Sequence, residues 1–261
     1  MKGWTCVGTS NARMTIDVTT TVHRPERWKS SDAARLLSHG IAAWPLLHLF
    51  IDAVRNDLTA NPIQAVTFRT GDAALACLIA SLVVTPLAVI GRQAWAAPSR
   101  RPLGLWAFAY ASLHLATFVV LDYGLDWGLI WETVSEKRYI LAGLASFVAM
   151  VPLAVTSTRG WQARLGQGWR RLHRLSYVAA VAAVIHFVWL VKADVREPLA
   201  WAIALAVLFV VRVPAVRRRL AAWRRTGRGA TRDARGSAYT ARDPVPTVVQ
   251  RAVVAGGRDT P

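Results

Sequence analysis

Histidines carry most of the chemistry available to this sequence of 261 residues. An ionisable side chain inside a membrane span is costly, so it predicts a functional site. A neutral imidazole in hydrocarbon needs partners for its ring nitrogens, and a bound iron together with a backbone carbonyl can supply them. Five of the six histidines lie in or at the ends of predicted spans: His39, His48, His114, His173 and His186.

His114 and His186 form the leading candidate pair. Counted from the predicted start of its own helix, His114 lies about 16 Å deep and His186 about 21 Å deep. Both helices are predicted to run outward, so the two imidazoles can lie at similar depth and bind one haem b. The alternative is an interhelical hydrogen bond made by a structural or proton-relay histidine.

His173 precedes His186 by 13 residues, a helical separation of about 20 Å that suits two haems stacked across a membrane. On a straight helix the two side chains would point about 140° apart, so we expect a π-bulge or a rotated last turn. The alternative for His173 is an interfacial residue among arginines. His39 and His48 share the first span, where a polar contact between helices competes with a ligand role.

The hydropathy pattern predicts an all-α polytopic membrane protein, because a spanning helix needs about 20 mostly apolar residues. Six stretches qualify: residues 35–54, 71–91, 103–121, 139–157, 172–191 and 198–216. We therefore expect a six-helix transmembrane bundle over residues 35–216. Residues 1–34 and 217–261 are expected to be largely disordered cytoplasmic tails, because the C-terminal one in particular lacks apolar periodicity.

The charge distribution predicts the orientation of the bundle. The net charge is +17, from 32 Lys and Arg against 15 Asp and Glu. Of these basic residues, 26 flank one side of the predicted spans and six the other, which places both termini in the cytoplasm by the positive-inside rule. The basic residues suit contact with anionic lipid, and the long charge-free blocks argue against nucleic acid. The two cysteines form no metal-binding or c-type haem motif.

Four segments resemble a known family. They read TGDAALACLIASLVVTPLA, RRPLGLWAFAYASLHLATF, LAVTSTRGWQARLG and WRRLHRLSYVAAVAAVIHFVWLVK. In this order they are similar to the MsrQ family, haem-binding membrane subunits of periplasmic methionine sulfoxide reductase systems. That family belongs to the ferric reductase-like transmembrane superfamily. The resemblance extends over residues 35–216.

The resemblance implies an electron-transfer subunit in the bacterial inner membrane, with catalysis left to a periplasmic molybdopterin-containing subunit. It implies haem b, FMN, and electrons from the quinone pool or a cytoplasmic flavin reductase. The family's haem ligands match His114, His173 and His186. Where two-haem members of the superfamily carry another histidine, this sequence has Arg100. Arg100, His39 or the absence of an inner haem are the open alternatives.

Other functions compete with electron transfer. A ferric reductase would need a separate flavin partner, because no GxGxxG motif occurs. A transporter or proton channel could use the histidines as a relay, and three prolines lie within the spans: Pro45, Pro86 and Pro152. A structural subunit would use the histidines only as helix contacts. The acidic and aromatic segment 122–138 is the candidate docking surface for an outside partner.

Overall fold

The computed structural model describes residues 27–91, 93–191, 194–216 and 218–219, and this part of the chain is helical without a strand. The long helices are α1 (Arg27–Val54), α2 (Pro62–Ile90), α3 (Arg100–Ala116), α5 (Arg138–Val155), α8 (Leu175–Leu190) and α9 (Arg196–Arg212). Shorter elements lie between them: η1 (Ala94–Ser99), the π-helix η2 (Thr117–Asp122), α4 (Trp127–Glu136), α6 (Arg159–Leu165) and α7 (Gln167–Leu172). The predicted all-α fold is confirmed.

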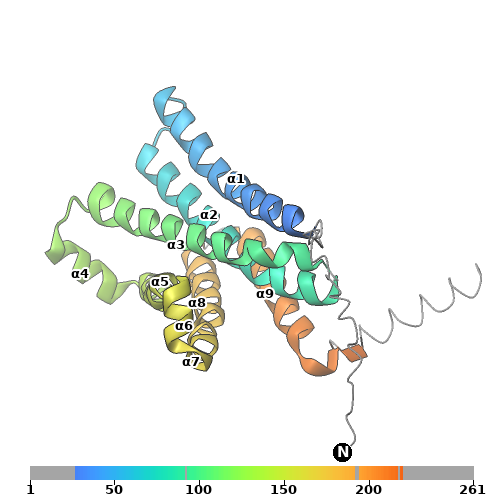
Figure 1. Ribbon diagram of the computed structural model, residues 1–261. Helices are drawn as coiled ribbons and strands as arrows, with labels where there is room; N and C mark the ends of the chain where they lie inside the picture. Colours follow the sequence, from blue (N-terminus) through green and yellow to red (C-terminus); the bar gives the residue numbers. More distant parts are fainter. Residues whose placement is uncertain (1–26, 92, 192–193, 217, 220–261) are drawn as a thin grey trace, which may run out of the picture.

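Two helix pairs make up the centre of the bundle. Helix α2 packs most extensively on α3, and α5 on α8. Figure 1 shows α1 alongside α2, and α3 between that pair and the α5–α8 pair. Helix α4 lies at the far end of α3, and α9 contacts both α8 and α2. The two pairs meet where α3 packs on α5.

Five helical segments of the described residues are long and apolar enough to cross a membrane, which confirms a multi-pass membrane protein. They are Asp32–Val54, Pro62–Ala88, Ala94–Asp122, Arg138–Val155 and Gln167–Leu190. The predicted sixth span corresponds to α9, which has 17 residues and lies at the lower limit of about 17–25 residues for a spanning helix. The count of six spans stays a prediction.

The first two helices begin earlier than the hydropathy pattern predicts. Helix α1 starts at Arg27, so residues 27–34 of the predicted tail are helical. Helix α2 starts at Pro62, because proline is favoured in the first turn and the Asn61 side chain accepts a hydrogen bond from the Gln64 amide at 3.1 Å. The predicted disorder of residues 1–26 and 220–261 lies outside the described residues.

A tyrosine hydroxyl joins α3 to α1 where a proline interrupts α1. The Tyr110 hydroxyl donates to the Ala42 carbonyl at 2.6 Å and accepts from the Leu46 amide at 3.0 Å. In a regular helix these two backbone groups would bond to each other. The hydroxyl is therefore inserted next to Pro45, a place where helices kink. Tyr110 is only 2% exposed.

A second proline creates the contact that ties α9 to α2. Pro86 has no amide hydrogen, so the Leu82 carbonyl one turn earlier lacks its helical donor. Arg212 at the end of α9 donates from Nη2 to this carbonyl at 2.5 Å. Its guanidinium carbon lies 4.7 Å from the centre of the Tyr177 ring on α8. One arginine thus links three helices.

The Tyr110 bridge predicts a measurable stability change. Tyr110→Phe keeps the ring but leaves the Ala42 carbonyl and Leu46 amide without their partner. We expect a loss of about 1–3 kcal/mol in the free energy of unfolding, measured by denaturation in detergent. Tyr123→Phe is the control, because no hydrogen bond of its hydroxyl is observed in the described residues. Equal stability of the two variants would contradict the bridging role.

Candidate functional site

His114 lies in the last turn of α3, immediately before the π-helix η2. Its Nδ1 is 2.8 Å from the Thr67 carbonyl oxygen on α2. A carbonyl can only accept a hydrogen bond, so Nδ1 carries the proton. In the neutral ring Nε2 then keeps its lone pair and stays available to a ligand.

His186 on α8 repeats this arrangement with the other helix pair. Its Nδ1 lies 2.6 Å from the Tyr139 carbonyl oxygen in the first turn of α5. The same reasoning leaves Nε2 of the neutral ring free to bind a metal ion. Each histidine is thus held by a backbone carbonyl of the helix paired with its own. This is a common way to fix the tautomer of a metal-binding imidazole.

The two imidazoles lie next to each other between the helix pairs. The similar depths predicted for them allow this arrangement. Their ring centres are 6.2 Å apart and their planes make an angle of 85°. An imidazole nitrogen lies about 2.0–2.1 Å from a bound metal in zinc sites. With about 1.1 Å more from nitrogen to ring centre, two imidazoles on opposite sides of one metal have centres about 6.4 Å apart. The observed spacing therefore fits bis-histidine ligation of a haem iron.

Two glycines border the histidine rings, and sequence reasoning did not single them out. A Cβ atom added at Gly71 on α2 would lie 3.2 Å from Nδ1 and Cε1 of His114. A Cβ atom added at Gly143 on α5 would lie 2.7 Å from Nδ1 of His186. Each glycine follows the residue whose carbonyl accepts the Nδ1 hydrogen bond, Thr67 or Tyr139, by four residues. Backbone carbonyl acceptors have no sequence signature. The glycines were therefore the feature of the sequence that could have indicated these two contacts.

His173 lies apart from this pair, in a break between α7 and α8. Residues 173 and 174 form a turn, so the expected departure from a straight helix is present, although it is a break and not a π-bulge. The His173 ring lies 3.9 Å from the Trp169 ring, centre to centre, and its Nδ1 is 3.1 Å from the Trp169 carbonyl oxygen. Arg100 is the first residue of α3.

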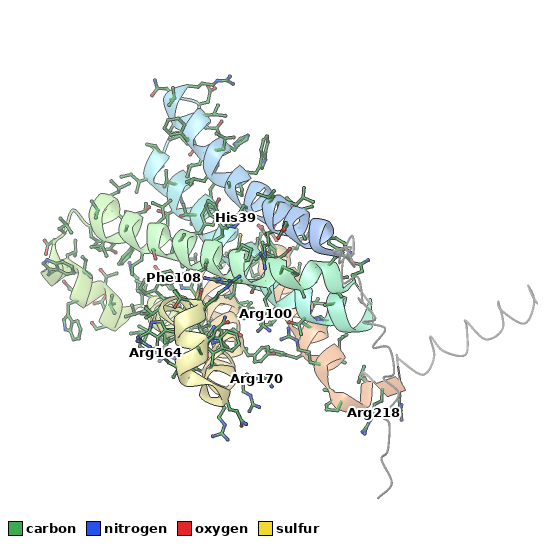
Figure 2. The ribbon with its side chains drawn as sticks, viewed as in Figure 1. His39, Arg100, Phe108, Arg164, Arg170 and Arg218 are labelled. Atoms are coloured by element: carbon green, nitrogen blue, oxygen red, sulfur yellow. The ribbon has the colours of Figure 1, made fainter. Side chains whose placement is uncertain are left out.

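The two histidines of α1 have other partners. Trp106 on α3 donates from Nε1 to Nδ1 of His39 at 3.0 Å, so Nε2 of a neutral His39 carries the proton. His48 is exposed, and its Nδ1 lies 3.0 Å from Asp52, which also pairs with Arg69. Figure 2 shows His39 beside α3, away from the arginines Arg164 and Arg170. Neither α1 histidine joins the His114–His186 pair.

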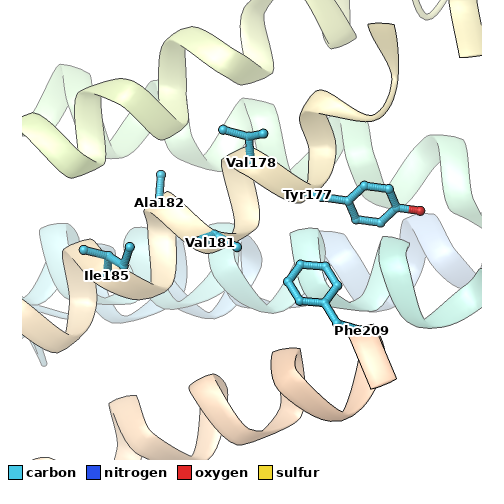
Figure 3. Close-up of a pocket in the computed structure, with 6 residues that line it drawn as sticks. All are labelled: Tyr177, Val178, Val181, Ala182, Ile185 and Phe209. Carbon is cyan, nitrogen blue, oxygen red and sulfur yellow. The ribbon is translucent and has the colours of Figure 1, made fainter. Parts of the chain in front are cut away.

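An apolar groove of about 330 Å³ runs along α8 and α9. It is lined by Tyr177, Val178, Val181, Ala182, Ile185 and Phe209 (Figure 3). None of the predicted ligands lines it. The candidate site is therefore the pair of imidazoles between the helix pairs, and this groove lies outside it.

The sequence matches known proteins of one class. Residues 70–184 match the model of the family described as ferric reductase like transmembrane component. This stretch contains His114 and His173 and the first part of α8. The chain is therefore similar to ferric reductase-like membrane proteins over a stretch that includes His114 and ends just before His186.

Curated relatives narrow the family further. The Rhodospirillum rubrum protein-methionine-sulfoxide reductase heme-binding subunit MsrQ is 47% identical over 177 residues, covering 67% of this chain and 85% of the relative. The same subunit of Xanthomonas euvesicatoria is 42% identical over 205 residues, covering 76% and 93%. The chain belongs to the MsrQ family, which confirms the resemblance seen in the sequence.

The hydrogen bonds predict different tautomers within one protein. In haem-free protein at alkaline pH we expect His114 and His186 to carry the proton on Nδ1 and His39 on Nε2. The ¹⁵N shifts of labelled imidazoles distinguish the two forms, and single His→Ala variants assign the signals. Trp106→Phe removes the donor to His39, so it should change the His39 tautomer alone. An Nε2–H tautomer at His114 or His186 would contradict the observed geometry.

Proposed function

We propose that this chain is a membrane electron-transfer subunit that binds b-type haem through His114 and His186. It would serve a periplasmic methionine sulfoxide reductase that repairs oxidised proteins, and it would not itself be the catalytic subunit. The observation that carries the proposal is the 6.2 Å spacing of two imidazoles whose Nδ1 atoms both face carbonyls. Membership of a family whose relatives are named heme-binding subunits supports it.

The residues around the two histidines would support electron transfer by a bound haem. Haem, when bound, supplies one-electron chemistry, and the protein supplies ligands, burial and orientation. His114 and His186 would hold the haem iron through Nε2. The carbonyls of Thr67 and Tyr139 hold the protons on Nδ1 and increase the basicity of the rings. The helices that carry these groups, α2, α3, α5 and α8, also contribute apolar side chains to the buried core of the bundle.

A second haem at the cytoplasmic end would use His173. Its Nδ1 also faces a carbonyl, that of Trp169, which leaves Nε2 free as in the main pair. Arg100, His39 or the absence of an inner haem stay the alternatives for the group on the other side. Of these, His39 already accepts a hydrogen bond from Trp106.

The orientation and the partners complete the proposal. The excess of basic residues on one side supports a bacterial inner-membrane protein with both termini in the cytoplasm. Electrons would come from the quinone pool or a cytoplasmic flavin reductase, and FMN would be a second cofactor, as the family resemblance implies. The molybdopterin-containing partner would dock outside on segment 122–138, whose helix α4 exposes Trp127 and Trp131.

Replacing the axial ligands tests the proposal. We expect His114→Ala and His186→Ala each to abolish the low-spin b-type absorption spectrum of the purified protein. Each substitution would leave the iron with one histidine, and the low-spin state needs two strong-field ligands. His48→Ala is the matched control, since this histidine is exposed on α1, and it should keep the full spectrum. Pyridine haemochrome analysis gives the number of haems per chain.

Two outcomes would overturn the proposal. Full low-spin spectra in both ligand variants would refute the ligand assignment. A folded but colourless wild-type protein after growth with ample haem would refute haem binding itself. A colourless protein would favour a transporter that uses the histidines as a proton relay. Such a transporter could use helices interrupted by proline, and Pro45 and Pro86 lie inside α1 and α2.

The docking surface generates a separate prediction. Trp131 is 76% exposed, and exposed tryptophans are frequent binding hot spots. We expect Trp131→Ala to weaken binding of the purified periplasmic subunit by about ten-fold or more while the haem spectrum stays unchanged. Trp95→Ala is the control, because Trp95 is also exposed but lies in η1 before α3. Equal effects of the two substitutions would exclude α4 as the docking site.

A further inference from the structure

We infer that Gly71 and Gly143 are positioning residues for the two haem-binding histidines. The inference rests on the proposed function and adds two residues that touch the imidazoles and not the iron. Each glycine lies on the helix that supplies the carbonyl and borders the ring that this carbonyl holds. The glycines would set the tilt of each ring and the length of its Nδ1 hydrogen bond.

The helix geometry explains why glycine is needed at these positions. In an α-helix every Cα–Cβ bond tilts toward the N-terminus, so the side chain at position i+4 covers the carbonyl of residue i. Gly71 is at i+4 from Thr67, and Gly143 is at i+4 from Tyr139. Because these positions have no Cβ atom, an imidazole from the neighbouring helix can reach the carbonyl of Thr67 or Tyr139. The helix that contains this carbonyl also uses it as an acceptor in its own backbone hydrogen bonding.

The same register occurs in both helix pairs. The carbonyl acceptor precedes its histidine by 47 residues in each case, from Thr67 to His114 and from Tyr139 to His186. Two other glycines inside long helices, Gly40 on α1 and Gly104 on α3, have no atom within 4 Å of an added Cβ. Close packing on a ring therefore belongs to the two glycines beside histidines and is not shared by these other helical glycines.

The distances predict graded effects. An added Cβ at Gly143 would lie 2.7 Å from Nδ1 and 3.0 Å from Cε1 of His186, so the ring must move. At Gly71 the nearest ring atoms of His114 are at 3.2 Å, a contact that a displacement of a few tenths of an ångström relieves. Gly143→Ala should therefore disturb the site more than Gly71→Ala.

The test compares Gly71→Ala and Gly143→Ala with Gly104→Ala. For Gly71→Ala we expect haem to be retained with an affinity about 10-fold weaker. A longer Nδ1 hydrogen bond donates less electron density to the iron, so the midpoint potential should rise. The EPR g-anisotropy of low-spin ferric haem depends on the angle between the two imidazole planes, here 85°, and it should change. Gly104→Ala should match the wild type in all three measurements.

Gly143→Ala should lose most of its haem, and a double variant keeps this result interpretable. His186→Ala removes the ring that an added methyl would meet. If steric contact with the ring is the cause, Gly143→Ala lowers the melting temperature in the wild-type background and not in His186→Ala. An equal loss in both backgrounds would show a role in helix packing alone and overturn the inference.

These measurements separate the two proposals. A wild-type protein without haem refutes the proposed function, whereas the melting temperatures of the double-variant cycle still measure contact between glycine and ring. A haem-containing wild type whose Gly71→Ala and Gly143→Ala variants keep its affinity, potential and EPR signal refutes the positioning role. In that case the ligand assignment stands.

Discussion

The cost of an unpaired polar group in hydrocarbon governs the arrangement of this bundle. An imidazole deep in a membrane has two nitrogens to satisfy. In this protein Nδ1 of His114 and of His186 each reach a carbonyl on the neighbouring helix. That hydrogen bond fixes the proton on Nδ1 and the direction of the Nε2 lone pair. The nitrogen that remains available to a ligand, Nε2, is therefore determined by a backbone contact.

The same constraint explains the other polar contacts of the interior. The Tyr110 hydroxyl forms hydrogen bonds with two backbone groups beside Pro45. Arg212 donates a hydrogen bond to the carbonyl that Pro86 leaves without a donor. Ser146 on α5 donates to the Ala179 carbonyl on α8 at 2.8 Å. In each case a side chain of one helix satisfies the backbone of another. Prolines that would weaken isolated helices thus become points of attachment between helices, as membrane bundles tolerate.

Much of the fold could be predicted because the spanning segments are long apolar blocks, a strong signal in any sequence. The start of α2 was missed because Arg69 lowers the hydropathy of its first turns, although Asp52 pairs with it. Counting along the helices also indicated that His114 and His186 can lie near each other, as the structure shows. Their carbonyl partners could not be predicted, because every residue has a carbonyl and only a tertiary contact selects Thr67 and Tyr139. The turn at residues 173 and 174 could not be located from the sequence either, because neither residue is a proline or a glycine.

The division of the site between two helix pairs links its chemistry to assembly. The Thr67 carbonyl of the α2–α3 pair holds His114, and the Tyr139 carbonyl of the α5–α8 pair holds His186, so each ring is oriented by contacts within its own pair. The packing of α3 on α5 joins the two pairs, and the two rings lie 6.2 Å apart, centre to centre. A group that binds both histidines stabilises only the assembled bundle, because ligand binding to the folded state alone shifts the equilibrium toward it. Loss of either histidine should therefore weaken the interface between the pairs as well as the binding of iron.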